Sequence, residues 1–223
     1  MTVMKNDTKK EYPAYAAIDI GSNAVRLLIK QLEDDERPLF SKVLLVRVPL
    51  RLGFDVFSEG RISSKKEKNM VRLMKAFRHL MKIYDVEDYR ACATSAMRDS
   101  ENGREIMRAV EEKAGIRIDI IDGQEEARMI YNNHVEYMKG RKGNFMYVDV
   151  GGGSTEINLL SDGELGCSRS YNIGTVRILS EVVAESEWKR LKSDMKDLAI
   201  SYPGINIIGS GGNINKLFKI VKS

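Results

Sequence analysis

Three glycine-rich segments follow short apolar runs in this sequence of 223 residues. They read Ile-Asp-Ile-Gly-Ser-Asn at 18–23, Val-Asp-Val-Gly-Gly-Gly-Ser-Thr-Glu at 148–156 and Gly-Ser-Gly-Gly-Asn at 209–213. Glycine permits a positive φ and lets backbone N–H groups approach a ligand, and successive N–H groups of such a turn form a concave anion site. A single turn of this kind is also typical of an ordinary hairpin. Three of them favour phosphate binding, with these candidate contacts: Ser22, Asn23, Gly151, Gly152, Gly153, Ser154, Gly211 and Gly212.

An aspartate precedes the triple-glycine segment at the end of its apolar run. A carboxylate at a strand end can hold a divalent cation, directly or through water. We therefore take Asp149 as the first candidate ligand for Mg²⁺.

Strands and helices alternate along most of the chain, which predicts an α/β architecture. The hydrophobic pattern and the turn residues predict strands at 14–20, 25–31, 39–48, 89–93, 116–121, 144–150, 154–160, 165–171 and 205–208. They predict helices at 64–84, from 99 or 100 to 115, at 124–138, twice between 174 and 199, and from 213 onward. Residues 94–98 are expected to form a loop.

The unit "strand, Asp-Xaa-Gly, strand" occurs twice, at 16–28 and at 146–159. The two aspartates, Asp19 and Asp149, are 149 − 19 = 130 residues apart, which is about one small domain. We therefore expect two related domains that face each other across a cleft, residues 1–123 and residues 124–223.

Basic residues are concentrated between positions 61 and 82, where eight lysines and arginines stand against the single acid Glu67. Such a stretch is typical of a solvated helix face, and it is also the candidate surface for a polyanion.

Composition excludes several classes of protein. Two cysteines cannot build a disulfide framework, and two histidines cannot supply a three-histidine zinc site. No apolar stretch is long enough to span a bilayer, and the first residues contain no apolar run of the kind found in secretory signals. We expect a cytoplasmic protein that has neither a membrane nor a nucleic acid as its partner.

The three glycine-rich segments, in this order and spacing, resemble the phosphate-binding loops of the sugar kinase, heat-shock protein and actin superfamily. Three further segments narrow the resemblance: Ala-Thr-Ser-Ala-Met-Arg at 93–98, Ile-Asp-Gly-Gln-Glu-Glu-Ala-Arg-Met-Ile-Tyr at 121–131, and Gly-Ser-Thr-Glu at 153–156. Together they look like the exopolyphosphatase / guanosine pentaphosphate phosphohydrolase family, over residues 15–219. The resemblance implies two actin-like (ribonuclease H-like) domains around a central cleft.

The same resemblance implies metal-dependent hydrolysis of a terminal phosphate from inorganic polyphosphate or from guanosine pentaphosphate. It gives Glu126 the role of the base that orients water, and it places Arg98 at the substrate. Adjacent helical residues point about 100° apart, so only one of Glu125 and Glu126 should face the cleft. Asp19 would assist with a metal-bound water, and Glu156 would be a second metal ligand or would orient the water. The cofactor would be Mg²⁺ or another divalent cation.

Two other functions stay open at this point: an ATP-binding kinase or ATPase of the same superfamily, and a non-catalytic module that binds polyphosphate or guanosine tetraphosphate. Family members continue with further helices after the third glycine-rich segment, so we expect a shortened second domain. The sequence leaves open the preference between the two substrates and whether the chain forms a homodimer.

Overall fold

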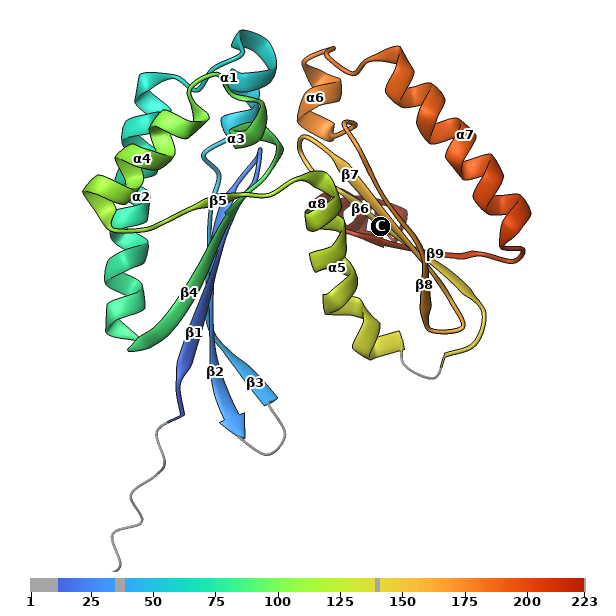
Figure 1. Cartoon of the computed structure of the whole chain (residues 1–223), viewed down its shortest axis with the longest axis horizontal. Helices are drawn as coiled ribbons and strands as arrows, with labels where there is room; N and C mark the ends of the chain where they lie inside the picture. Colours follow the sequence, from blue (N-terminus) through green and yellow to red (C-terminus); the bar gives the residue numbers. More distant parts are fainter. Residues whose placement is uncertain (1–11, 35–38, 139–140, 223) are drawn as a thin grey trace, which may run out of the picture.

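The computed structural model describes residues 12–34, 39–138 and 141–222. Two sheets, each with its own helices, follow one another along the chain (Figure 1). None of the helices in this described part is both long and apolar enough to cross a membrane. Residues 1–11, in which we expected no secretory signal, lie outside the described residues.

The first sheet has five strands in the order β3-β2-β1-β4-β5. Its strands are β1 (Ala14–Ile20), β2 (Val25–Asp34), β3 (Leu39–Val48), β4 (Val86–Ala93) and β5 (Asp119–Ile120), and its helices are α1 (Leu52–Glu59), α2 (Ser64–Ile83), α3 (Ser95–Asp99) and α4 (Gly103–Ala114). β1 pairs antiparallel with β2 and parallel with β4. Burial alternates along β1, because successive side chains of a strand point to opposite faces.

The helices of this unit cover one face of the sheet. Met70, Met74, Phe77 and Met81 recur along α2 and are all buried in the core that also contains the inward side chains of β1 and β2. This is the apolar stripe that the helical spacing predicts for residues 64–84. Among the described residues of this unit, no helix covers the opposite face of β1, β2 and β3 (Figure 1).

The second sheet has four strands in the order β8-β7-β6-β9. Its strands are β6 (Asn144–Val150), β7 (Thr155–Ser161), β8 (Glu164–Tyr171) and β9 (Asn206–Ser210), and its helices are α5 (Gly123–Met138), α6 (Thr175–Leu179), α7 (Glu185–Ser201) and α8 (Gly212–Lys222). β6 pairs antiparallel with β7 and parallel with β9, as β1 does with β2 and β4. The predicted repeat is thus confirmed as a repeat of topology.

The helix α5 begins at Gly123, where the chain leaves the first sheet, and it packs on β7 and β8 of the second. The two units also meet through α1 and α6. These contacts place α5 with the second sheet rather than with the first.

Three expectations about elements are wrong. Residues 95–99 form the short helix α3 instead of a loop, and the strand expected at 116–121 is reduced to Asp119–Ile120. The helix α1 was not predicted at all. Its N-cap residue Arg51 has a left-handed backbone (φ 54°) and makes no side-chain capping bond, so the usual start signal is missing.

Candidate functional site

A cleft of about 560 Å³ lies between the two units. It is lined by ten of the residues that the sequence singled out: Asp19, Ser22, Asn23, Glu126, Asp149, Gly151, Gly152, Glu156, Gly211 and Gly212. Three others, Arg98, Gly153 and Ser154, do not line it. The structure therefore brings all three glycine-rich segments and all four candidate carboxylates to one place.

The carbonyl groups of the triple-glycine segment are held by the start of α6. The N–H groups of Thr175 and Val176 donate to the carbonyls of Gly151 (3.0 Å) and Gly152 (2.8 Å). Arg177 Nε donates to the carbonyl of Gly153 at 2.9 Å. With these carbonyls engaged, the N–H groups of Gly152 and Gly153 have no recorded partner in the described part of the chain. An arrangement with free N–H groups and tied carbonyls suits an anion.

Glycine is needed in this segment for close approach and not for a positive φ. A Cβ on Gly152 would lie 3.1 Å from Ser22 Cβ, and one on Gly153 would lie 2.1 Å from Ser95 Oγ. The expected positive φ is wrong for residues 151–153; within the three glycine-rich segments, all of which the structure describes, Gly211 alone has it, with φ +93°. A Cβ on Gly211 would lie 2.7 Å from Asp149 Oδ1. The loops of the two units are thus packed directly against each other.

Two of the predicted hydroxyl donors are already engaged. Ser22 is buried and its Oγ hydrogen-bonds with Ser95 Oγ at 2.9 Å. Ser154 is buried and its hydroxyl hydrogen-bonds to the carboxylate of Glu156. In this arrangement the two hydroxyls join the loops to their surroundings, and the backbone N–H groups are left as donors.

The carboxylates stand at equivalent places in the two sheets. Asp19 is near the end of β1 and Asp149 near the end of β6, where Asp149 is the register partner of Glu156 on β7. Glu126 is in the first turn of α5. Its neighbour Glu125 points elsewhere and pairs with Arg90 (2.8 Å), so Glu126 is the one that lines the cleft.

Two carboxylates of the cleft, Glu126 and Glu156, have raised pKa values. Burial, reinforced by the neighbouring Glu156, raises the pKa of Glu126 to about 8. Burial also raises the pKa of Glu156 to about 7, against hydrogen bonds from Ser154 and Ser170 that lower it. Glu126 Oε2 is buried without a hydrogen-bond partner in the described structure. Negative charge is therefore under-compensated at this point of the cleft.

Arg98 lies next to the cleft instead of in its lining. Its Nη1 donates to the carbonyl of Ile121 at 2.9 Å, and its Nε lies 3.5 Å from Asp99 Oδ1. The Arg98 side chain lines a neighbouring cavity beside α4. Its charge nevertheless offsets part of the rise that burial causes in the pKa values of Glu126 and Glu156, because the guanidinium is close to both carboxylates.

Sequence reasoning missed Arg177 and Arg26. Arg177 pairs with Asp99 of the first unit at 2.5 Å, stacks over Phe57 of α1 at 4.2 Å, and holds Gly153 as described above. Nothing in the local sequence marks it. Arg26 pairs with Asp19 at 2.6 Å, and its place opposite Asp19 could be read from the register of the predicted hairpin.

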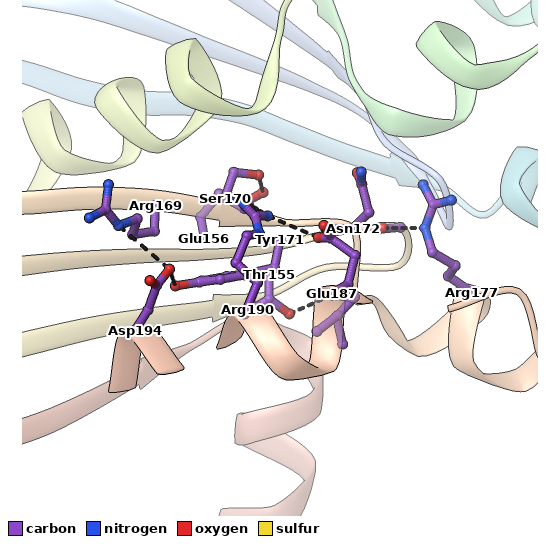
Figure 2. A network of polar contacts seen from close by, with 12 residues as sticks. Thr155, Glu156, Arg169, Ser170, Tyr171, Asn172, Arg177, Glu187, Arg190 and Asp194 are labelled. Carbon is purple, nitrogen blue, oxygen red and sulfur yellow. Dashed lines mark hydrogen bonds and ion pairs between the residues drawn. The ribbon is translucent and has the colours of Figure 1, made fainter. Parts of the chain in front are cut away.

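The strand β8 carries a second set of polar contacts behind the carboxylates (Figure 2). Ser170 Oγ lies 3.1 Å from Glu156 Oε1, while Arg190 of α7 donates to the Ser170 carbonyl at 2.7 Å and stacks over the ring of Tyr171. Tyr171 in turn donates to Asp194 of α7 at 2.7 Å. The helix α7 thus fixes the strand that supports Glu156.

The residues present fit a divalent cation of the Mg²⁺ type. Mg²⁺ is commonly held by one or two carboxylates together with water and substrate phosphates. Asp149 and Glu156 supply such oxygens, and Glu126 has a buried oxygen without a hydrogen-bond partner in the described structure. Burial raises the pKa values of Glu126 and Glu156, and a bound cation would favour the charged form of both. Among the described residues no cluster of three or more His, Cys, Asp or Glu forms a metal cage of protein ligands alone.

Comparisons with known proteins agree with this arrangement. Residues 30–200 match the model of the Ppx/GppA phosphatase family. The chain is 33% identical over 168 residues to a bifunctional 3-dehydroquinate synthase/phosphatase of Fusobacterium nucleatum, covering 73% of this chain and 25% of that protein. It is 24% identical over 198 residues to exopolyphosphatase 1 of Mycobacterium tuberculosis, covering 87% of this chain and 57% of that protein. The chain thus spans about a quarter of the first relative and a little more than half of the second.

Solved structures of this family are also similar to the chain. The Aquifex aeolicus member of the Ppx/GppA family superposes with a TM-score of 0.70 at 30% identity, over 90% of this chain and 66% of that one. An exopolyphosphatase from Cytophaga hutchinsonii superposes with a TM-score of 0.82 at 20% identity, over 93% and 69% of the two chains, which shows a shared fold. The match over residues 30–200, together with the expected two-unit α/β fold, shows that this chain belongs to the Ppx/GppA phosphatase family.

Proposed function

We propose that this chain hydrolyses the terminal phosphoanhydride of inorganic polyphosphate, of guanosine pentaphosphate, or of both, with the help of a divalent cation. The observation that carries the proposal is the convergence, in one cleft, of phosphate-type loops and of four carboxylates with too little positive charge. The site lies between residues 1–123 and residues 124–223, which we take as the two domains.

In this proposal the terminal phosphoryl group lies against the loops at 21–23, 151–154 and 211–212. The N–H group of Gly152, which lines the cleft, binds one of its oxygens, since the Gly152 carbonyl is tied to the start of α6. Positioning and electrostatic stabilisation are the main contributions that a protein makes to phosphoryl transfer. Arg98 adds a positive charge from the side of α3, with its guanidinium fixed by the Ile121 carbonyl.

Glu126 is our candidate for the group that orients and deprotonates the attacking water. Its unpartnered Oε2 is available to accept a hydrogen bond from that water. A base is most effective when its pKa is close to the working pH, and a pKa of about 8 meets this condition. Asp19 and Glu156 flank the same space from the two sheets and assist in holding the water.

Asp149 and Glu156 would hold the divalent cation, which supplies charge neutralisation for the phosphoryl oxygens. Ser154 and Ser170 keep the Glu156 carboxylate in place through their hydroxyls. Gly211 leaves the space beside Asp149 Oδ1 that a side chain would fill.

The family match supports a phosphatase over a kinase or ATPase of the same superfamily. A test mixes the chain with long-chain polyphosphate and Mg²⁺, without ATP, and follows the release of orthophosphate. Steady release supports the proposal. Binding without release would favour the non-catalytic module, and transfer of a phosphoryl group from ATP to an acceptor would favour the kinase.

A further inference from the structure

The face of the first sheet that is turned away from α2 continues from the cleft along β2 and β3. Asp19 and Ala17 of β1, Arg26 of β2 and Arg90 of β4 line the cleft from this face. The next side chains on the same face of β2 are Leu28 and Lys30, because every second residue of a strand shares a face. Figure 1 shows this side of the sheet turned toward α5 and the second sheet.

The strand register groups basic side chains on this face. Arg47 of β3 is the partner of Arg26, which itself is the partner of Asp19. Farther from the cleft, Lys42 of β3 is the partner of Lys30. Lys30, Lys42 and Arg47 are all exposed. Lys30 is four positions beyond Arg26 on β2, so the basic surface reaches about 13 Å down the strands from the cleft.

The acids around this surface are few or already paired. Asp19 pairs with Arg26, and Glu125 of α5 pairs with Arg90. Asp88 of β4 is the partner of Tyr15, on the other side of β1 from β2. Glu33 and Asp34 follow at the far end of β2. No ion pair is recorded in the described structure for any of these three cations: Lys30, Lys42 and Arg47.

We propose that Lys30, Lys42 and Arg47 hold the phosphate chain of a linear polyphosphate whose terminal phosphate lies in the cleft. This inference rests on the proposed function, and it assigns the residues that would favour a long chain over a short one. Arg26 and Arg90, at the cleft itself, connect the surface to the terminal site. Multiple contacts between cations and phosphates release counterions, so the affinity for a long chain should depend steeply on salt.

The structure favours this face over the basic stretch at 61–82 that the sequence suggested. Lys68, Arg72 and Lys75 are exposed on α2, but α2 packs against the opposite face of the sheet. A chain that ends in the cleft would have to pass around the sheet to reach them. These three residues therefore offer a control, because their substitution removes the same positive charge from the side of the first sheet that is turned away from the cleft.

The surface also contains exposed apolar side chains. Tyr15 and Phe40 contact each other edge to face, with ring centroids 6.2 Å apart. Leu45 of β3 is the partner of Leu28 and is 55% exposed. Aromatic rings beside cations are also the pattern that binds the bases of single-stranded nucleic acid. Single-stranded RNA is therefore the competing ligand in the test.

The experiment compares two triple variants of the full chain. One carries Lys30→Gln, Lys42→Gln and Arg47→Gln, and the control carries Lys68→Gln, Arg72→Gln and Lys75→Gln. The affinity for long-chain polyphosphate is measured by calorimetry without a divalent cation, over a series of salt concentrations. Turnover of tripolyphosphate with Mg²⁺ and the melting temperature are measured for both variants.

We expect the β2–β3 variant to bind the long chain at least about tenfold more weakly at low salt, with a salt slope reduced by about two. Its turnover of tripolyphosphate and its melting temperature should stay at the wild-type level, and the α2 variant should bind like the wild type. If the triple variant does not fold, Lys42→Gln and Arg47→Gln on the edge strand β3 are tested singly, with smaller losses expected.

An equal loss in both variants would overturn the inference, because it would reflect net charge alone. Wild-type affinity in the β2–β3 variant, or a loss only in the α2 variant, would also overturn it. Tighter binding of RNA than of polyphosphate, lost with the same three substitutions, would assign the face to nucleic acid instead. A wild-type chain that binds polyphosphate but releases no phosphate would contradict the proposed function. The binding comparison between the two triple variants would still decide whether this face holds the chain.

Discussion

Replacement of Glu126 by glutamine should have opposite effects on activity and on stability. The folded chain holds the pKa of this carboxyl at about 8, well above the ordinary value of 4.5. Between these two pH values the folded state binds more protons than the unfolded state. The free energy of unfolding therefore falls as the pH rises through this window. Glutamine is neutral at every pH and removes this loss.

The size of the effect follows from the same pKa difference. One pH unit corresponds to about 1.4 kcal/mol, so the penalty at pH 9 reaches at most about 5 kcal/mol. For a chain of this size, 1 kcal/mol corresponds to about 2–4 °C in melting temperature. We expect Glu126→Gln to melt several degrees above the wild type at pH 9 and close to it at pH 5. Turnover should fall by roughly 10²–10⁴-fold, the contribution of a general base.

The assays are thermal melts from pH 5 to pH 9 and phosphate release from polyphosphate with Mg²⁺. Glu125→Gln is the matched control, because the Glu125 side chain is only half-buried and its pair with Arg90 contributes little to stability. It should change neither quantity by much. Wild-type turnover in Glu126→Gln, or an inactive Glu125→Gln, would refute the assignment of the base. A pH-independent difference in melting temperature would refute the electrostatic argument.

Four further predictions test the cation site and the loops. Addition of Mg²⁺ or Mn²⁺ at pH 7 should release protons, since a cation lowers the raised pKa values of Glu126 and Glu156; calorimetry in two buffers of different ionisation enthalpy measures this, and no release would contradict it. Asp149→Asn should raise the Mg²⁺ concentration needed for half-maximal activity, and an unchanged titration would remove Asp149 from the cation site. Gly174→Ala would place a Cβ 2.5 Å from the Gly152 carbonyl, so it should cost about 1–3 kcal/mol of unfolding free energy in chemical denaturation, and an unchanged midpoint would argue against this contact. Arg177→Lys should keep the charge but lose one of the two contacts to Gly153 and Asp99, so it should weaken phosphate binding by calorimetry, whereas wild-type affinity would show that the loop holds its shape without Arg177.

Much of the fold could be predicted from local patterns. The alternating burial of β1 and the apolar stripe of α2 follow directly from residue spacing. The helix α1 could not be predicted in this way, because it starts from a left-handed arginine that no capping rule covers. The helix α3 has only five residues and shows no periodicity.

The sequence predicted which residues form the candidate site better than it predicted how their side chains are oriented. The glycine-rich segments and the carboxylates meet as expected, since the two sheets present equivalent strand ends to one cleft. The directions of Ser22 and Arg98 depend on contacts with Ser95 and Ile121, which are distant along the chain. No spacing rule within one segment reveals such contacts.

The most direct test of the central claim is a time course of orthophosphate release from long-chain polyphosphate by the purified chain with Mg²⁺ and without ATP. We expect orthophosphate to accumulate while the polyphosphate shortens from its ends, and Glu126→Gln to abolish nearly all of this release under the same conditions. A wild-type chain that binds polyphosphate yet releases no orthophosphate, or that releases it equally well with glutamine at position 126, would contradict the account.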